Sequence, residues 1–112
     1  MNISMARRIA KKSTHKLFSH VAIITSGKRV LSVGYNRGEV HAEEVAIKRL
    51  LHKHRNNKND PRALTLTSLM FKKRNGHIGT NSFPCEACLI KIAKTKIRWI
   101  TFINKGIITT IC

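Results

Sequence analysis

The stretch His41-Ala42-Glu43, together with Pro84-Cys85-Glu86-Ala87-Cys88 further along the chain, decides how this sequence is interpreted. It supplies one imidazole and two thiols, the nitrogen and sulfur ligands that zinc prefers in proteins. Three protein ligands leave the fourth tetrahedral position to water, which distinguishes a catalytic zinc site from a closed structural one. A carboxylate two residues after the histidine is close enough to take a proton from that water. The two motifs therefore predict an open zinc centre with the ligands His41, Cys85 and Cys88 and the base Glu43.

Each motif has a simpler explanation when it is taken alone. A Cys-x-x-Cys pair after a strand also occurs in thioredoxin-like redox proteins, and short His-x-Glu triplets arise by chance. A closed structural site would need a fourth protein ligand, and the remaining histidines are the candidates: His15, His20, His52, His54 and His77. Both motifs together, with a proline before the first cysteine and a helix expected after each motif, favour the open metal centre.

Length and composition set the broad class. The 112 residues fit one domain spanning 1–112, and a hydrophobic share of 42% is enough for a small compact core. No apolar run approaches the roughly 20 residues of a membrane span, and the basic start lacks the apolar stretch of a secretory signal. Two of the three cysteines stand at metal-ligand spacing. We therefore expect the cytoplasm or another intracellular reducing compartment rather than a disulfide framework.

The charge balance is extreme for a chain of this length. Twenty-two Lys and Arg face five Asp and Glu, which gives a formal net charge of +17. Such a charge attracts polyanions, and nucleic acid is the usual one; a lysine-rich composition without a specific partner is the simpler alternative. Four of the five acids lie in or beside the two motifs, namely Glu39, Glu43, Glu44 and Glu86. The sequence thus predicts negative charge near the metal and a basic surface elsewhere.

Hydrophobic periodicity predicts alternating helices and strands. Helices are expected at about 5–17, from about 41 to the polar loop at 56–61, and from Pro84 onward; strands are expected at about 20–25, 30–35, 64–73, 97–103 and 107–111. Pro84 suits a first helical turn because it lacks an N–H, and that helix is expected to turn Leu89, Ile90, Ile92 and Ala93 inward. The short turn Asn104-Lys105-Gly106 makes the last two strands antiparallel, because a parallel pair needs a long crossover.

Three blocks of the chain resemble the cytidine deaminase superfamily, the zinc-dependent CMP/dCMP-type deaminases. The blocks are Gly34-Tyr35-Asn36, His41-Ala42-Glu43-Glu44 and Ser82-Phe83-Pro84-Cys85-Glu86-Ala87-Cys88. The resemblance extends from His20 to about Ile111 and implies a three-layer α/β fold, with helices flanking a five-stranded mixed sheet. His-x-Glu followed by Pro-Cys-x-x-Cys is the signature of zinc nucleobase deaminases, in which the glutamate is a general acid and base.

The resemblance also implies roles for individual residues. The implied zinc ligands are His41, Cys85 and Cys88, the implied proton shuttle is Glu43, Asn36 would contact the substrate sugar, and the backbone around Ala42 and Ser82 would hold the edge of the base. The closing hairpin leaves no room for the helix that deoxycytidylate and tRNA adenosine deaminases place there. This hairpin ending is similar to that of free cytidine deaminases, blasticidin deaminases and several toxin deaminases. Free cytidine deaminases, however, usually carry cysteine in place of His41.

The leading expectation for the substrate is cytosine in single-stranded DNA or RNA, deaminated to uracil, because a basic surface surrounds a small acidic site. The aromatic share of 5% argues against it, since proteins that bind unpaired bases normally stack them on aromatic rings. The few candidates are Tyr35, Phe83 and Trp99, and Trp99 is expected in the core.

Three alternatives stay open. A free cytidine or deoxycytidine nucleoside or nucleotide is the first, and its phosphate would suit Arg37 or Lys28. Adenine deamination is the second, and a catalytically idle, zinc-stabilised nucleic-acid-binding module is the third; the intact Glu43 argues against the last. Members of the superfamily often form homo-oligomers, and no membrane partner is expected.

Overall fold

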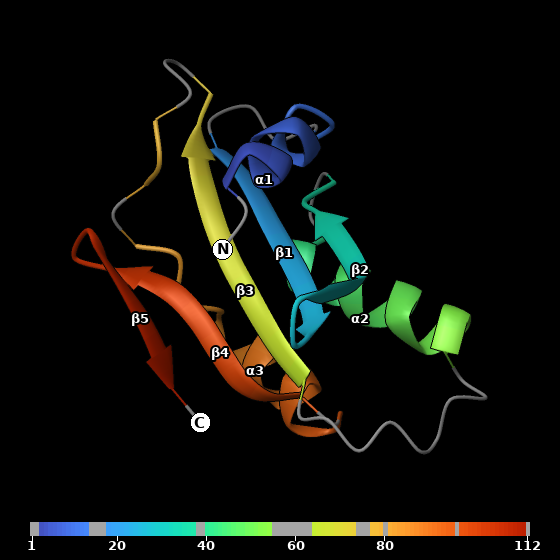
Figure 1. Cartoon of the computed structure of the whole chain (residues 1–112). Coiled ribbons are helices and arrows are strands. Elements are labelled where there is room, and N and C mark those ends of the chain that lie inside the picture. The colour runs from blue at the N-terminus through green and yellow to red at the C-terminus, as the bar shows by residue number, and fades with distance from the viewer. Residues whose placement is uncertain are drawn as a thin grey trace.

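The computed structural model describes residues 3–13, 18–37, 40–54, 64–73, 77–79, 81–95 and 97–111, without the side chains of 52–54. Within these residues lie three helices and five strands (Figure 1). Their order is α1 (Ile3–Ala10), β1 (Phe18–Ser26), β2 (Arg29–Tyr35), α2 (Ala42–His54), β3 (Leu64–Lys72), α3 (Glu86–Ala93), β4 (Ile97–Asn104) and β5 (Ile107–Ile111).

The strands form one mixed sheet in the order β2-β1-β3-β4-β5. β3 and β4 are parallel, and the other neighbouring pairs are antiparallel. Lys105 and Gly106 have φ values of 50° and 79° in the turn between β4 and β5, which is the backbone that a two-residue type I′ hairpin requires. The predicted α/β fold, with a five-stranded mixed sheet and antiparallel last strands, is confirmed.

The helices cover the sheet from both sides and make two cores (Figure 1). On one side, α2 and α3 pack against inward side chains such as Ile24, Leu66 and Phe102. On the other side, α1 packs against Val21, Leu69 and neighbouring apolar side chains. The middle of β1 is buried at four consecutive positions, 21–24, because a strand covered on both faces needs apolar residues at successive positions.

A close approach between β2 and α2 positions the start of α2. A Cβ atom on Gly34 would lie 2.3 Å from the carbonyl oxygen of Ala42 and 2.5 Å from the nitrogen of Ala46. Only glycine lets the two backbones come this near. The Ser32 hydroxyl adds a hydrogen bond of 2.7 Å to the carbonyl of Ala46, so the first turns of α2 are held firmly against the sheet.

Two helices differ in detail from the sequence prediction. α1 ends at Ala10, short of the predicted 17, and residues 14–17 lie outside the described part. Cys85 caps α3, so Pro84 precedes the helix instead of entering its first turn. Ile90 is 54% exposed and Ala93 is exposed, while Ile92 is buried, because α3 meets the sheet along one narrow stripe.

Trp99 was expected in the core, and this expectation is wrong because its side chain is 36% exposed. Ile100, the next residue in β4, belongs to the core on the side of α2 and α3. Successive strand residues point to opposite faces, so Trp99 lies on the face that carries α1. The eight residues of α1 cover only part of that face. None of the helices in the described ranges is long and apolar enough to span a membrane.

Candidate metal centre

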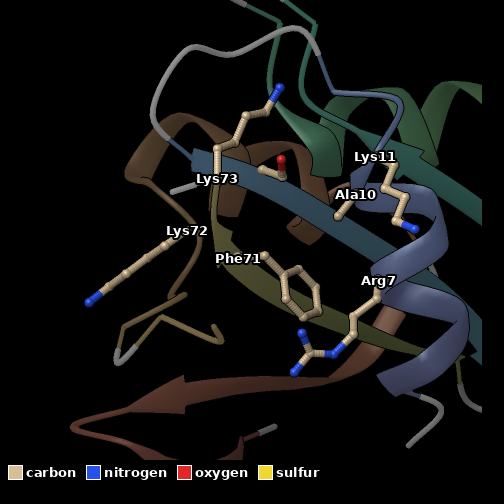
Figure 2. Close-up of a pocket in the computed structure, with 7 residues that line it drawn as sticks. Arg7, Ala10, Lys11, Phe71, Lys72 and Lys73 are labelled. Atoms are coloured by element: carbon tan, nitrogen blue, oxygen red, sulfur yellow. The ribbon is translucent and has the colours of Figure 1, made fainter. Parts of the chain in front are cut away.

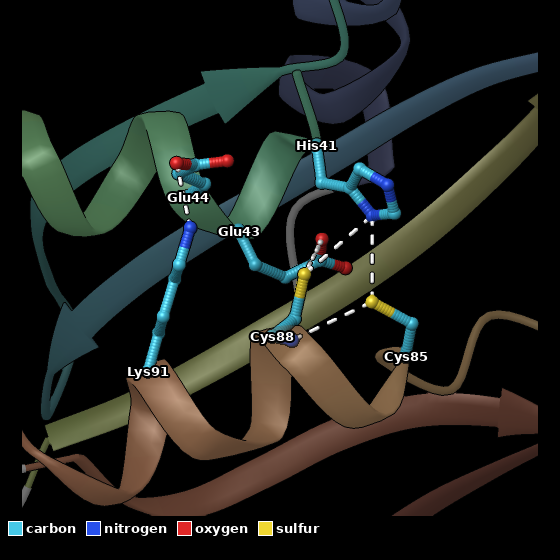
Figure 3. A network of polar contacts seen from close by, with 6 residues as sticks. All are labelled: His41, Glu43, Glu44, Cys85, Cys88 and Lys91. Atoms are coloured by element: carbon cyan, nitrogen blue, oxygen red, sulfur yellow. Dashed lines mark hydrogen bonds and ion pairs between the residues drawn. The ribbon is translucent and has the colours of Figure 1, made fainter. Parts of the chain in front are cut away.

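His41 lies directly before α2, and its carbonyl accepts the first bond of the helix, from the Val45 N–H at 3.2 Å. The side chain of His41 is exposed. Glu43, in the first turn, is only 2% exposed and points inward. The start of α2 thus places an accessible imidazole and a buried carboxylate side by side, as Figure 3 shows.

The second motif forms the start of α3. Cys85 is the N-cap, with an extended backbone at φ −69° and ψ 166°, and its sulfur accepts a hydrogen bond from the Cys88 N–H at 3.4 Å. Its carbonyl accepts the Leu89 N–H at 2.9 Å. Cys88 follows one turn later and is 4% exposed. Both sulfurs therefore project from the first turn of α3, one at the surface and one in the interior.

The two helix starts bring three ligand atoms together. His41 Nδ1 lies 3.6 Å from Cys85 Sγ and 3.5 Å from Cys88 Sγ (Figure 3), and all three atoms lie within 4.8 Å of one another. Tetrahedral zinc with ordinary Zn–S bonds of ~2.3 Å and Zn–N bonds of ~2.05 Å places nitrogen and sulfur about 3.6 Å apart. The two nitrogen–sulfur distances therefore match those of tetrahedral zinc.

The cluster has three ligands within the described residues, and no fourth His, Cys, Asp or Glu there joins it. His20 and His77, two candidates for closing the site, are described and lie outside the cluster. The other candidates lie outside the described side chains: His15, His52 and His54. Three donors are the number that catalytic zinc sites use.

Glu43 is fixed by two neighbours on opposite sides of its carboxylate. The Ser68 hydroxyl from β3 donates to Oε1 at 3.0 Å, and the Cys88 thiol donates to Oε2 at 3.6 Å. The carboxylate therefore lies beside the cluster without being one of its three members. Sequence reasoning found Glu43 but missed Ser68, because nothing in the local pattern of β3 marks one buried serine as a partner of α2.

The two ligand-bearing helices are also joined by an ion pair. Lys91 Nζ on α3 lies 2.6 Å from Glu44 Oε1 on α2 (Figure 3). The hydrogen bond from Lys91 holds the pKa of the Glu44 carboxyl below its ordinary value. Both side chains are substantially exposed, so the pair contributes little to stability, as is usual for surface pairs.

Burial raises the pKa of the Cys88 thiol, and the hydrogen bond with Cys85 and the charge of Glu43 raise it further. Without a metal, Cys88 is thus a neutral thiol at physiological pH. A divalent cation reverses this balance because thiolate, and not thiol, is the metal ligand. A bound cation would offset the negative charge of the two thiolates and of the Glu43 carboxylate beside them.

Ser82 anchors the segment that leads into Cys85. Its hydroxyl donates to the carbonyl of Ser68 at 2.7 Å, and the Ser68 hydroxyl reaches the carbonyl of Ser82 at 2.7 Å. The Ser82 N–H donates to the carbonyl of Ile103 at 2.9 Å, and the Ile103 N–H donates back to the Ser82 hydroxyl at 2.7 Å. Ser82 is therefore bonded to both β3 and β4, which fixes the position of the cysteines.

Asn36, expected to contact substrate, is buried at the end of β2 and largely engaged within the protein. Its Oδ1 accepts hydrogen bonds from the Ser13 hydroxyl and from the His20 N–H, the latter at 2.9 Å. Its Nδ2 donates to the carbonyl of Phe18 at 3.2 Å, so one amide hydrogen has no acceptor among these contacts. Ala42, the first residue of α2, is completely buried.

The mixed sheet, the two helix starts and the His–Cys–Cys cluster with its adjacent glutamate together define an α/β zinc domain of the nucleobase deaminase class. A family model described as the cytidine and deoxycytidylate deaminase zinc-binding region matches residues 2–104, and the chain belongs to this family. No curated protein matches the chain.

The family match and the side-chain cluster support two of the predictions made from the sequence, the superfamily and the metal. The resemblance to the cytidine deaminase superfamily is confirmed, and both the zinc-binding region and the cluster of His41, Cys85 and Cys88 fit Zn²⁺. The protein is thus a zinc-dependent deaminase of the cytidine and deoxycytidylate type.

Proposed function

We propose that this protein hydrolyses cytosine to uracil in single-stranded nucleic acid, with His41, Cys85 and Cys88 as zinc ligands and Glu43 as the general acid and base. One observation carries the proposal: a buried carboxylate lies against a three-donor cluster whose spacing suits zinc. Zinc, when bound in such a site, acts as a Lewis acid and makes water a stronger nucleophile. Two thiolates offset the charge of the metal and weaken this effect, so the reaction needs a base at the position of Glu43.

In the proposed reaction, water and cytosine become uracil and ammonia. A C–O bond forms at C4 and the C4–N bond to the exocyclic amine breaks. Glu43 takes one proton from the attacking water and delivers it to the ring nitrogen. It then takes the second proton, from the hydroxyl newly bound to C4, and delivers it to the departing amine, which leaves as ammonia while the C4 carbonyl forms, so that one carboxylate serves in turn as base and acid. Ser68 holds this carboxylate in place, and its burial keeps it away from bulk water.

We also propose how the substrate is held. Asn36 offers its remaining amide hydrogen to the sugar. Ser82 uses its hydroxyl and N–H within the protein, so the backbone beside Ser82 and at Ala42, rather than the Ser82 side chain, contacts the edge of the base. These assignments are the ones that the resemblance to the family implies, and the free amide hydrogen of Asn36 supports its part.

Phe83 supports an unpaired base as the substrate. It precedes the cysteine motif, its ring packs edge-on against Phe102 with centroids 4.7 Å apart, and it is 46% exposed. A ring that is held in place by one neighbour and partly exposed is a suitable surface for stacking one base. The net charge of +17 favours a polyanionic strand over a small nucleoside.

A substrate panel tests the proposal. Zinc-loaded protein is incubated with single-stranded DNA, single-stranded RNA, cytidine, deoxycytidylate and adenosine, and uracil, inosine and ammonia are measured. We expect uracil in an oligonucleotide. Turnover of cytidine or deoxycytidylate with none on oligonucleotides would overturn the substrate assignment, inosine would overturn the base assignment, and a fully zinc-loaded protein without any turnover would identify an idle binding module.

A further inference from the structure

A basic hollow lies on the side of the sheet opposite α2 and α3, between α1 and the ends of β1 and β3 (Figure 2). We name it the α1 hollow; its volume is about 340 Å³, which is at the lower end of the range for small-ligand sites. Four cationic side chains line it, namely Arg7, Lys11, Lys72 and Lys73. The remaining lining residues are Ala10, Ser19 and Phe71, and all three are buried.

The floor of the α1 hollow orients one of these cations. The Arg7 guanidinium carbon lies 5.3 Å from the centroid of the Phe71 ring, close enough for a cation–π interaction. Phe71 itself is 3% exposed, so the ring is a fixed support. A guanidinium held over a ring is restrained in position, and its fork of N–H groups suits bidentate contact with a phosphate.

The electrostatics of the α1 hollow favour an anion. Among its described lining residues none is acidic. The ion pair between Lys91 and Glu44 lies on the other side of the sheet, between α2 and α3. Lys11, Lys72 and Lys73 are all exposed at the rim. Like charges gathered in a concave surface repel one another and concentrate polyanions.

Hydrogen bonds join the α1 hollow to Asn36, the residue that the proposed function places against the substrate sugar. Lys73 Nζ donates to the carbonyl of Ser13, and the Ser13 hydroxyl donates to Asn36 Oδ1. Lys72 pairs across the sheet with Phe18, and the carbonyl of Phe18 accepts a bond from Asn36 Nδ2.

One further cation follows Asn36 in the chain. The next residue, Arg37, is exposed, and it is bridged to Val40, the neighbour of His41. Hydrogen bonds thus join the α1 hollow to Asn36, and Arg37 adds one exposed cation between Asn36 and His41 in the sequence.

We propose that the α1 hollow binds the phosphate backbone of the single-stranded nucleic acid whose cytosine reaches the zinc site. This inference rests on the proposed function. Arg7, Lys11, Lys72 and Lys73 hold the strand through phosphates, and Arg37 lies on its way to His41. The contacts carry no base preference, because phosphate contacts position a strand without reading its sequence.

A charge-matched pair of variants tests the α1 hollow. Lys11→Gln/Lys72→Gln removes two exposed charges from the rim and leaves the Lys73–Ser13–Asn36 contacts intact. Lys48→Gln/Lys94→Gln removes two exposed charges from α2 and the end of α3. Zinc content and thermal unfolding of both are checked first. Binding of a labelled oligothymidylate, which contains no cytosine, is then measured over a range of salt concentrations, alongside deamination of a cytosine-containing oligonucleotide and of cytidine.

We expect the Lys11→Gln/Lys72→Gln protein, the rim variant, to bind the oligothymidylate about tenfold more weakly than the wild type. The slope of log affinity against log salt should become shallower by about 1.4, because each lost phosphate contact on a single strand accounts for ~0.7. The affinity of the Lys48→Gln/Lys94→Gln protein, the α2/α3 variant, should differ from that of the wild type by less than about twofold, because the two removed charges contact no phosphate. Cytidine turnover, where the wild type shows it, should be equal in both variants. Equal loss of binding in the two variants, or an unchanged salt slope in the rim variant, would overturn the inference.

The same experiment separates this inference from the proposed function. If the wild type deaminates the oligonucleotide and both variants behave alike, the proposed function stands and the α1 hollow is not its strand-binding site. If the wild type binds but does not deaminate, the proposed function fails, while selective loss of binding in the rim variant still locates the site. Displacement of the strand by millimolar inorganic phosphate as readily as by unlabelled oligothymidylate would show a site for small anions and would also overturn the inference.

Discussion

The hydroxyl of Ser68 lies 3.0 Å from Glu43 Oε1 and 2.7 Å from the carbonyl oxygen of Ser82. Ser68 is completely buried, and its single hydroxyl hydrogen is shared between these two acceptors. By alternating or bifurcating between them, Ser68 connects the carboxylate on α2 with the segment that carries the cysteines. It is a positioning residue, since it contacts Glu43 and no ligand atom of the cluster.

Ser68→Ala should lower kcat by about tenfold and leave KM nearly unchanged, because a buried carboxylate without its donor loses an interaction of about 1.4 kcal/mol. Zinc content should stay at the wild-type level. The measurement is steady-state kinetics on the substrate that the panel identifies. Ser32→Ala is the matched control, since Ser32 is also buried and bonds to the α2 backbone but not to Glu43. Equal losses of kcat in Ser68→Ala and Ser32→Ala would show that Ser68 stabilises the fold without positioning Glu43.

The sequence predicted which residues form the His–Cys–Cys cluster but not the groups that hold them in place. His41, Cys85 and Cys88 are found because metal chemistry requires particular residue types at short spacings. Ser68 and Glu43 are 25 residues apart, and their contact depends on the register of β3 against α2, which no local pattern specifies. The strands were predicted well because each is a distinct apolar run, and the hairpin turn fixed the direction of β5.

Helix faces were predicted less well than strands. Ile90 looked like a core residue by hydrophobicity alone, and it is exposed because α3 faces the core through a stripe of Cys88, Leu89 and Ile92. Trp99 is exposed because α1 is too short to cover its part of the sheet. Both errors have the same cause: burial is decided by what packs on top of a residue, and the sequence of one element does not contain that information.

Glu43→Gln should abolish turnover, by at least about 100-fold, while it preserves zinc binding and fold. Glutamine has the same shape, and its amide oxygen can still accept the Ser68 hydroxyl, but it cannot carry a proton between water and the base. Kinetics, zinc stoichiometry and thermal unfolding are measured on the same preparation. Substantial activity in a zinc-loaded Glu43→Gln protein would be inconsistent with Glu43 as the proton shuttle.

Gly34→Ala should destabilise the protein by about 2–3 kcal/mol and weaken zinc binding, because the added Cβ overlaps the backbone at Ala42 and Ala46. The clash moves the start of α2, and with it His41. Gly106→Ala is the control: its φ of +79° makes alanine unfavourable, but nothing lies within 4 Å of the added atom, so it should cost about 1 kcal/mol and leave zinc affinity unchanged. Denaturant unfolding and zinc titration measure both. Unchanged zinc affinity in Gly34→Ala would show that the close contact between β2 and α2 does not determine the position of His41.

The zinc-free and zinc-loaded proteins should respond to pH in opposite directions. In the zinc-free fold the pKa of the Cys88 thiol is raised, above the value of about 8.5 for a free cysteine. The folded state then retains a proton that the unfolded chain loses, so this contribution to the free energy of unfolding is fully present below about pH 8.5 and declines as pH rises above it. Zinc requires the thiolate, so the zinc-loaded protein should instead lose metal and stability as pH falls, and zinc binding at neutral pH should release protons.

Urea unfolding with and without zinc, between about pH 6 and pH 10, measures both trends. Calorimetric zinc titration in buffers of different ionisation enthalpy measures the proton release. Zinc-free Cys88→Ala is the control, because it removes the raised thiol and should therefore lose less stability above pH 8.5 than the zinc-free wild type does. The same alkaline loss in both zinc-free proteins would assign the effect to lysine titration, and zinc binding without proton release would mean that Cys88 is not a thiolate ligand. The opposing trends thus test, without any turnover assay, whether the Cys88 thiol that is neutral in the zinc-free protein becomes a metal ligand.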